Sequence, residues 1–496
     1  MWYTAVYFLS DVYLAKKEKG RLKMSWKKNG FSYFMWLLYT VAVGSGIFCL
    51  VMLRGRQTGY SLPICLLIGC ACLLAAGAVV FFLRLFAGAA SKLRANKKLS
   101  YLSESGLVAA LLCTGLFLCI WNFPESLTGD GYYELAKVTG EQGVIQVVHG
   151  AVYLYLQLLH IVCLLFGNKI ALGVWLQVIL YLLAAVAFYF AVRRLAGVVS
   201  AIIMLAFMML SPFLAAEALV LSPNILFLLI YGMALYVASG CLKKSDCSML
   251  RYCVTGIVIA ITVYLDIAGI TLFVFMLSGM LVRRERLGTL GICFGSAIIG
   301  FFGCIALDTV LSGKEFFSVL MAWRSLYSPE VFALPVIVCA GKAYWDMIVL
   351  LLIMSLGIFS FRYPQEVERT SVWVLASAAL IAMQCFQITT VEMMGFQLLY
   401  IFMAVLAGIG ICNVFAPAKS ASKETAIKAA KIVKSDTIVK TEAVSAPAAG
   451  VRFIENPLPL PKKHVAKTMD YRLKPDEKDG FDYDYPVDEN DDFDIL

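Results

Sequence analysis

Long apolar runs alternate with short polar segments along most of this chain. The runs are roughly 17 to 25 residues long, enough to cross a hydrocarbon core of about 30 Å as a helix. Because lipid offers no partners to backbone N–H and C=O groups, these runs must be helical. The pattern predicts an all-α, polytopic membrane protein with about twelve transmembrane helices. The predicted spans cover residues 31–53, 62–87, 105–121, 169–192, 195–212, 222–241, 250–265, 268–282, 287–309, 343–361, 371–388 and 395–415.

The composition supports this class and excludes an ordinary soluble domain. Hydrophobic residues make up 61% of the 496 residues and charged residues 15%, whereas soluble domains are about half apolar and about a quarter charged. Basic residues gather in alternate loops, which is the bias of cytoplasmic loops. We therefore expect a multi-pass protein of the cell membrane with both termini in the cytoplasm. The net charge of +9 reflects this topology, and we expect no nucleic-acid partner.

Residues 149–166 are also apolar and leave one alternative open, a thirteenth span. If they crossed the membrane, Arg193 and Arg194 would lie outside, and the later basic loops would be inverted as well. The segment is short for a span and carries Gln157 and His160. We therefore expect a juxtamembrane helix along the outer interface.

Four regions follow from this pattern. Residues 1–30 form a basic, cytoplasmic N-terminus, in which either Met1 or Met24 is the start. Residues 31–104 hold two additional spans, and residues 105–415 form the main transmembrane domain, whose first outer loop is 122–168. Residues 416–496 form a disordered cytoplasmic tail, basic and then acidic. Residues 451–496 are a candidate docking segment for a cytoplasmic protein, with a simple spacer as the alternative for their proline-rich part.

The first outer loop holds the candidate chemistry. Gly129 and Gly131 flank Asp130, and a short helix is predicted to follow. Asp130 and Glu134 are four residues apart, which places both carboxylates on one face if the helix includes Asp130. The alternative is structural: Asp130 caps the helix, and Glu134 pairs with Lys137.

Several motifs in order resemble the GT-C membrane glycosyltransferases, a superfamily that includes protein O-mannosyltransferases and aminoarabinose transferases. They are the loop aspartate that opens a short helix, then HGAVYLYLQLLHIVCLLFG, a span ending RRLAG and a span ending LSPFL. The resemblance covers residues 105–230. It implies a GT-C-like core with extracytoplasmic juxtamembrane helices, and transfer of a sugar from a polyprenyl-phosphate donor to an extracytoplasmic acceptor with inversion.

By this resemblance, Asp130 is the candidate general base. Glu134, the nearest other acid, is a second candidate catalytic residue. A phosphate leaving group needs no protonation, but it does need positive charge or hydrogen-bond donors. Lys137 and Arg324 are the candidate cations, with an interfacial anchor as the alternative for Arg324. Candidates for substrate binding also include one acid, two aromatic residues and one histidine: Glu217, Trp323, Tyr327 and His149. The alternative for His149 is a structural role, in which it turns the chain onto the membrane.

The chain also departs from the family pattern. Members often carry a second acid directly after the loop aspartate, where this chain has Gly131. After the SPF signature, members commonly show an arginine and then an aspartate, and here Asn224 lies near the expected aspartate. These departures leave phosphate binding and a divalent metal site open.

Two other functions compete with a transferase. A non-catalytic scaffold of envelope assembly with a degenerate transferase fold accounts for the departures, and the long tail is compatible with it. A transporter or flippase commonly buries ionisable groups in broken helices near the middle of the membrane. Here the prolines fall at the ends of spans and the deep parts of the spans carry almost no charge, which disfavours ion-coupled transport.

Overall fold

The structure, a computed structural model, describes nine stretches of the chain. They are residues 22–93, 97–123, 151–167, 169–243, 248–283, 287–325, 343–360, 364–385 and 392–415. By its contacts the chain divides into two units, residues 1–418 and 419–496, and every described residue belongs to the first. The expected tail, with its docking segment 451–496, lies outside the described residues.

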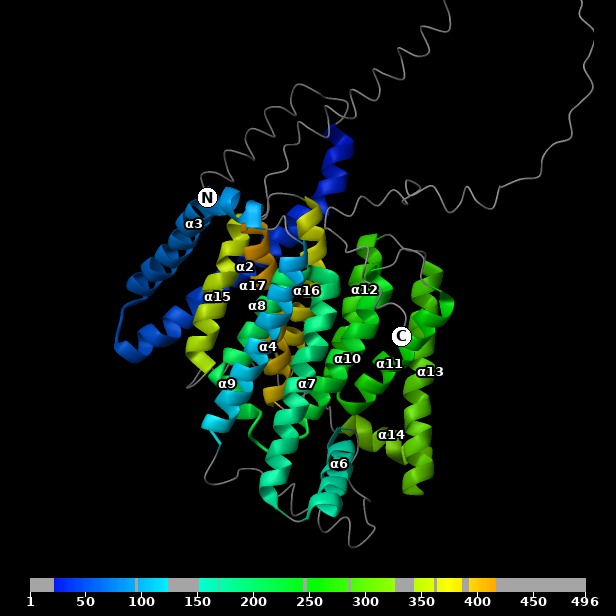
Figure 1. Ribbon diagram of the computed structural model, residues 1–496. Helices are drawn as coiled ribbons and strands as arrows, with labels where there is room; N and C mark the ends of the chain where they lie inside the picture. The colour runs from blue at the N-terminus through cyan, green and yellow to red at the C-terminus, as the bar shows by residue number, and fades with distance from the viewer. Residues whose placement is uncertain are drawn as a thin grey trace, which may run out of the picture. The chain divides into compact units, whose positions relative to one another are not determined.

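The described part of the chain consists of helices and short connections, with no strand in these stretches. The helices, shown in Figure 1, are α2 (Leu22–Thr58), α3 (Leu62–Leu93), α4 (Lys97–Trp121), α6 (Ala151–Phe166), α7 (Ile170–Ala196), α8 (Val198–Leu210), α9 (Pro212–Glu217), α10 (Asn224–Lys243), α11 (Met249–Leu265), the 3₁₀ turn η1 (Ile267–Gly269), α12 (Ile270–Arg283), α13 (Leu287–Ser312), α14 (Phe316–Ser325), α15 (Ala343–Ser360), α16 (Pro364–Cys385) and α17 (Glu392–Phe415).

Each predicted span coincides with one of these helices. Seven helices, namely α2, α3, α4, α7, α10, α13 and α17, are both long and apolar enough to cross a membrane. Shorter apolar helices include α8, α11, α15 and α16. The protein is therefore an all-α, multi-pass membrane protein, and the count of twelve spans stays a prediction. The break between α7 and α8 falls at Gly197, whose φ of 88° favours glycine.

The helices run up and down beside one another, so their ends gather at two ends of the bundle (Figure 1). One end, here called the Asp346 end, holds the last turns of α4, α8, α11 and α13 and the first turns of α7, α10, α15 and α17. The opposite end, called the Arg193 end, holds the last turn of α7 and the first turn of α4.

Contacts at both ends show that α4 and α7 are antiparallel neighbours. At the Asp346 end the rings of Phe123 and Trp175 lie 6.1 Å apart. At the Arg193 end the Nε atom of Arg193 lies 2.8 Å from a carboxylate oxygen of Glu104. The segment between α4 and α7 therefore leaves and returns at the same end. Its helix α6 packs on α7 and α10, and at 16 residues it is among the shorter apolar helices.

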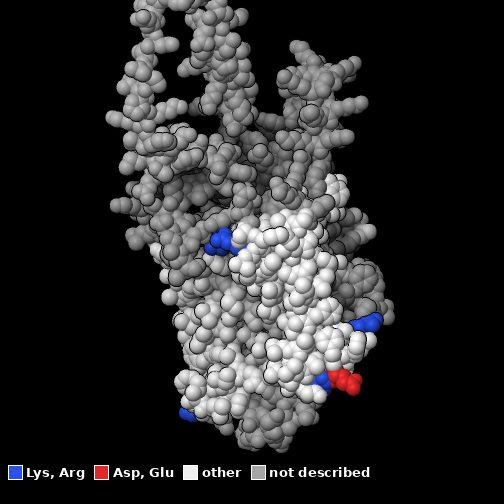
Figure 2. Space-filling view, turned by 90° about the vertical axis from the view of Figure 1, so that its right-hand side faces the viewer, with Lys and Arg blue, Asp and Glu red and all other residues white. Residues whose placement is uncertain are grey.

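The core lies around α17. In its apolar stretch 83% of the residues are buried, against 11% in α4 and 11% in α13, which places these two at the periphery. Buried aromatic side chains link α17 to its neighbours: Phe402 packs edge-on against Trp373 of α16. Figure 2 shows a broad uncharged surface whose few charged side chains lie around its margin. Such a surface suits contact with lipid chains.

Small residues let pairs of helices approach closely, as is usual in membranes. A Cβ atom at Gly256 of α11 would lie 2.4 Å from the carbonyl oxygen of Cys293 in α13. A Cβ atom at Gly408 of α17 would lie 2.8 Å from the backbone of Ser200 in α8. Backbone cannot move aside as a side chain can, so both positions require glycine.

Gly256→Val is expected to destabilise the bundle, because its side chain would force α11 away from α13. We expect a loss of about 1–3 kcal/mol or more, measured as a lower thermal unfolding midpoint of the detergent-solubilised protein. The matched control is Gly295→Val on α13, where a Cβ atom meets nothing within 4 Å. Equal midpoints for the two variants would contradict the close packing of α11 on α13.

Candidate functional site

The predicted catalytic loop lies outside the described residues. This applies to Asp130, Glu134, Lys137 and His149, and also to Tyr327 beyond α14. Their roles therefore stay predictions. The structure does describe both anchors of the loop, since α4 ends beside α7 and α6 packs on α7 and α10. The loop therefore starts and finishes at the Asp346 end, where α9 and the first turns of α10, α15 and α17 also lie (Figure 1).

Ser211, the first residue of the SPF signature, has two roles at this end. Its Oγ accepts a hydrogen bond from the Leu214 N–H (3.2 Å) and so caps α9. The same hydroxyl donates to the carboxylate of Asp346 in the first turn of α15 (2.6 Å). The Phe213 N–H also points to that carboxylate oxygen, at 3.4 Å. One buried serine thus joins α8, α9 and α15.

Aromatic residues close this junction against α17. The ring of Phe213 packs edge-on against Phe396, with centroids 5.1 Å apart. Tyr400 lies beside both Ser211 and Asp346, and its ring meets Phe207 edge-on. We call Ser211, Phe213, Asp346, Phe396 and Tyr400 the SPF junction. It fixes the position of α9 and of the connection 218–223 that follows.

Glu217, the predicted substrate-binding acid, ends α9 and is half-buried. Burial raises the pKa of its carboxyl group, because a partly dehydrated site disfavours the charged form. Helix α9 packs on α4 as well as on α15. Glu217 therefore lies on the short helix that adjoins the end of α4, from which the predicted catalytic loop departs.

A second polar group lies where α7 and α10 begin. The side-chain amide of Gln177 donates to the carbonyl oxygens of Ser222 (2.6 Å) and Val220 (3.0 Å). Three buried oxygens here have no hydrogen-bond partner among the described residues: Gln177 Oε1, Ser222 Oγ and Asn224 Oδ1. Asn224 is the residue near the expected family aspartate. Because buried polar atoms normally find partners, this group is suited to receive donors such as sugar hydroxyls or water.

Trp323 and Arg324 lie apart from this region. They belong to α14, which packs on α13, whereas α9 packs on α8, α15 and α4. The indole N–H of Trp323 donates to the Tyr264 carbonyl (2.9 Å), and its ring packs edge-on against Phe301. Arg324 is exposed. The structure therefore does not bring these two residues together with Glu217, and it holds Trp323 as an anchor of α14.

Asp266 is a buried acid that the sequence interpretation left at a helix end. It lies between α11 and η1, is 3% exposed, and accepts from the Ala268 N–H (2.7 Å). Burial raises its pKa to about 6, although the Ala268 hydrogen bond acts in the opposite direction. The nearby Asp308 is engaged by the Tyr264 hydroxyl (2.8 Å). Neither carboxylate faces the SPF junction.

A metal site is not formed by the described residues. No group of three or more His, Cys, Asp or Glu side chains comes together in these stretches. Glu217, Asp266, Asp308 and Asp346 belong to α9, to the turn before η1, to α13 and to α15. The described acids therefore do not come together as a site for a divalent metal.

The opposite end carries a charged junction of its own. Arg193 pairs with Glu104, and the Tyr189 hydroxyl donates to the same carboxylate. The guanidinium of Arg194 lies 3.9 Å from the centre of the Tyr236 ring, a cation–π arrangement. These contacts join α4 to α7 and α7 to α10. None of the candidate catalytic or binding residues takes part in these contacts.

Several solved structures are similar to this chain. No protein-family model matches the chain, and no curated protein sequence matches it. The chain is similar to ArnT from Cupriavidus metallidurans bound to undecaprenyl phosphate, with 14% identity and a TM-score of 0.45 over 70% of this chain and 66% of that one. It is also similar to the Archaeoglobus fulgidus oligosaccharyltransferase in complex with zinc and sulfate, with 15% identity and a TM-score of 0.41 over 62% and 49%.

A third similar structure is the archaeal oligosaccharyltransferase AglB from Archaeoglobus fulgidus in complex with an inhibitory peptide and a dolichol-phosphate, with 15% identity and a TM-score of 0.42 over 64% of this chain and 51% of that one. The chain thus spans less than two thirds of the length of each of these proteins.

Ser211→Ala is expected to destabilise the protein by about 1–3 kcal/mol, because it removes a helix cap and a donor to a partly buried carboxylate. The measurement is the thermal unfolding midpoint in detergent. Ser45→Ala is the matched control, since Ser45 is exposed and donates only to Ala42 of its own helix. If Ser211→Ala costs less stability in an Asp346→Ala background than in the wild type, the two side chains are coupled as described; additive losses would contradict the coupling.

Ionisation of the buried Asp266 is expected to lower the stability of the protein as the pH rises. The folded pKa of about 6 lies above the ordinary value of 3.8, so the unfolded chain ionises first. The contribution of this carboxyl group is greatest below the ordinary pKa and is lost as the pH rises through about 6. The size is on the order of 2 kcal/mol.

Asp266→Asn tests this assignment, because asparagine keeps a capping side chain but does not ionise. Thermal unfolding between about pH 4 and pH 8 should show a smaller decline for Asp266→Asn than for the wild type. Glu315→Gln removes an exposed carboxylate and should keep the wild-type profile. A profile of Asp266→Asn that superimposes on the wild type would remove Asp266 as the cause.

Proposed function

We propose that the protein is a membrane glycosyltransferase that moves a sugar from a polyprenyl-phosphate donor to an acceptor hydroxyl, with inversion at the anomeric carbon. The resemblance of residues 105–230 supports this proposal. One observation carries it: the loop with Asp130 leaves α4 and returns to α7 at the end of the bundle where α9, the helix of the SPF signature, packs on α4. The anchors of the loop with Asp130 therefore share one end with the SPF signature, whereas the RRLAG motif ends α7 at the Arg193 end.

The orientation belongs to the same proposal. Basic residues mark the Arg193 end, at Lys97, Arg193, Lys243 and Arg283. Since basic residues favour the cytoplasmic side, we place that end in the cytoplasm together with both termini. The Asp346 end then faces the extracytoplasmic side of the cell membrane, where a polyprenyl-phosphate donor presents its sugar.

The chemistry requires one base and one cation. Asp130 takes the proton of the acceptor hydroxyl as its oxygen attacks the anomeric carbon. The bond from that carbon to the phosphate oxygen breaks, and the phosphate leaves with the electron pair. A phosphate leaves without a proton, in contrast to the alcohol released by glycosidases, which require a second carboxyl as acid. Glu134, four residues after Asp130, is a second carboxylate in the same loop.

The leaving phosphate needs positive charge, and the arrangement of helices favours Lys137 over Arg324. Lys137 belongs to the loop that departs beside α9, whereas α14 with Arg324 packs on α13. The half-buried carboxyl of Glu217 and the unpartnered oxygens of Gln177 and Asn224 are groups that accept hydrogen bonds from sugar hydroxyls. His149, which precedes α6 along the chain, stays a candidate for substrate binding.

The test is release of polyprenyl phosphate from radiolabelled polyprenyl-phosphate sugars by the purified protein in lipid. Asp130→Asn is expected to lower the rate at least about 10²-fold, the scale of a missing general base. Glu134→Gln shows whether the second carboxylate contributes. Glu315→Gln, an exposed acid on the connection between α13 and α14, is the matched control and should keep the wild-type rate.

Two results would change the proposal. Equal turnover by wild type and Asp130→Asn would keep the transferase but remove Asp130 from its mechanism. No turnover by folded wild type across a broad panel of donors and acceptors would favour the non-catalytic scaffold.

A further inference from the structure

Both anchors of the predicted catalytic loop meet one short stretch near the start of α7. On one side, the ring of Trp175 lies 6.1 Å from that of Phe123, which follows the end of α4. On another side, a Cβ atom at Gly173 would lie 3.1 Å from Leu159 of α6 and 3.1 Å from Leu221. Leu221 belongs to the connection between α9 and α10, and both leucines are fully buried. The helix before the loop, the helix after it and this connection therefore meet on the same part of α7.

Gln177 holds the connection between α9 and α10 on this part of α7. Its side chain is fully buried, and its amide nitrogen donates to the carbonyl oxygens of Val220 (3.0 Å) and Ser222 (2.6 Å). These carbonyls lie between helices, and a buried carbonyl needs a donor. One side chain supplies a donor to each of them. Because a buried acceptor that loses its donor is costly, the connection is fixed at this position on α7.

The connection joins elements that touch both anchors of the loop. The helix before it, α9, packs on α4. Within it, Leu221 shares the space over Gly173 with Leu159 of α6, and the helix after it, α10, also packs on α6. A shift of the connection along α7 therefore changes the position of α6 relative to the end of α4. These are the two helices between which the loop with Asp130 runs.

We propose that Gln177 is a positioning residue, whose hydrogen bonds to the connection set the spacing between the two anchors of the catalytic loop. The proposal rests on the proposed function for its consequence, which is the placing of Asp130 against the acceptor hydroxyl. Gln177 acts through the connection and not on the reacting atoms. Since a displacement of about 1 Å can cost about 10²-fold in rate, a small change in this spacing is enough to affect turnover.

The first experiment measures the spacing itself, in the full-length protein in nanodiscs. Spin labels are carried by unnatural amino acids at Asn122, just after α4, and at Leu154 in α6, which are both exposed. This choice leaves the native cysteines unlabelled. Electron–electron double resonance gives the distribution of distances between the two labels. Gln177→Met keeps a long unbranched side chain but removes both donors, and it is expected to displace or broaden this distribution.

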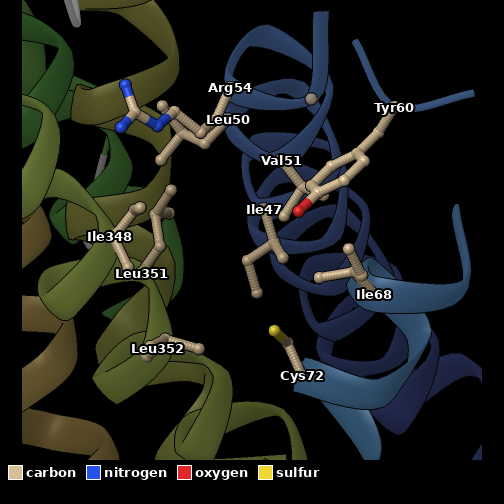
Figure 3. Close-up of a pocket in the computed structure, with 11 residues that line it drawn as sticks. Ile47, Leu50, Val51, Arg54, Tyr60, Ile68, Cys72, Ile348, Leu351 and Leu352 are labelled. Atoms are coloured by element: carbon tan, nitrogen blue, oxygen red, sulfur yellow. The ribbon is translucent and has the colours of Figure 1, made fainter. Parts of the chain in front are cut away.

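The matched control removes a buried hydrogen bond elsewhere in the bundle. Tyr39 of α2 donates to the Met354 carbonyl of α15 (2.7 Å). Figure 3 shows the neighbouring part of this contact, where Ile47 of α2 and Leu351 of α15 border an apolar groove. Helix α2 packs on α3, α15 and α16, whereas α7 packs on α4, α6, α8, α10 and α17. Tyr39→Phe is therefore expected to leave the label distances and the turnover of folded protein unchanged.

The second experiment asks whether the spacing acts through Asp130. With the radiolabelled polyprenyl-phosphate sugars of the proposed function, Gln177→Met is expected to lower kcat about tenfold or more and to leave the KM for the donor unchanged. In the Asp130→Asn background the same change should cost little more, because the contribution of the base is already absent. A loss of folded protein would instead lower both rates by the same factor.

A second variant reaches the same contact from the other side and decides the question if Gln177→Met does not fold. Gly173→Val places its side chain where Leu159 and Leu221 lie. It should displace the label distances and lower kcat in the same way. Gly44→Val on α2, where a Cβ atom meets nothing within 4 Å, is its matched control. Retention of the folded peak in size-exclusion chromatography shows which variants are intact.

Three results would overturn the proposal. One is a distribution of label distances that Gln177→Met leaves unchanged. Another is the same factor of lost rate in the wild-type and Asp130→Asn backgrounds. The third is a raised KM at unchanged kcat, which would place Gln177 in contact with the sugar. Because the distance measurement needs no turnover, it decides the spacing even if the wild type transfers no sugar, so failure of this proposal is distinct from failure of the proposed function.

Discussion

The constraint on which this structure depends is that no backbone N–H or C=O group can remain unpaired in lipid. Helices satisfy it, and the polar side chains within them respect it too. The hydroxyls of Thr114, Thr262 and Ser377 donate to carbonyls one turn earlier in their own helices. Among the described residues, the contacts between helices that involve carboxylates lie near helix ends, as for Glu104 with Arg193 and Asp346 with Ser211.

The two ends meet this constraint in different ways. At the Arg193 end, a charged pair and a cation–π contact join neighbouring helices through long side chains. At the Asp346 end, the SPF junction uses a short hydroxyl that caps α9 and also donates to a carboxylate. The short connection keeps α9 close to α15 and α17, so the position of the half-buried Glu217 is tightly determined by packing.

The spans could be predicted because a long apolar run is a local signal, and their bounds followed from Gly197 and from charges at the helix ends. The junctions could not be predicted in this way. Asp346 is a single acid at the start of a predicted span, and nothing in its neighbourhood along the chain indicates Ser211, 135 residues away, as its partner. Helix periodicity indicates which face is apolar but does not identify the helix that covers it.

The same limit explains the mixed outcome for the candidate site. Loop membership along the chain groups Glu217 with the end of the bundle that anchors the predicted catalytic loop, and α9, which Glu217 ends, packs on α4. It also grouped Trp323 and Arg324 with that end, but α14 packs on α13 and lies on another side of the bundle from α9. A topology prediction specifies the side of the membrane for each loop. The position around the bundle depends on helix packing, which the loops do not encode.

The SPF signature shows why a motif alone cannot separate an active transferase from a scaffold. In this chain Ser211 caps a helix and joins three elements, Pro212 starts α9, and Phe213 packs on Phe396. Each residue has a structural reason to be present whether or not a sugar is transferred. A degenerate transferase would need the same junction to fold. The discriminating residues are therefore to be sought outside this junction, and the loop acids Asp130 and Glu134 are the candidates.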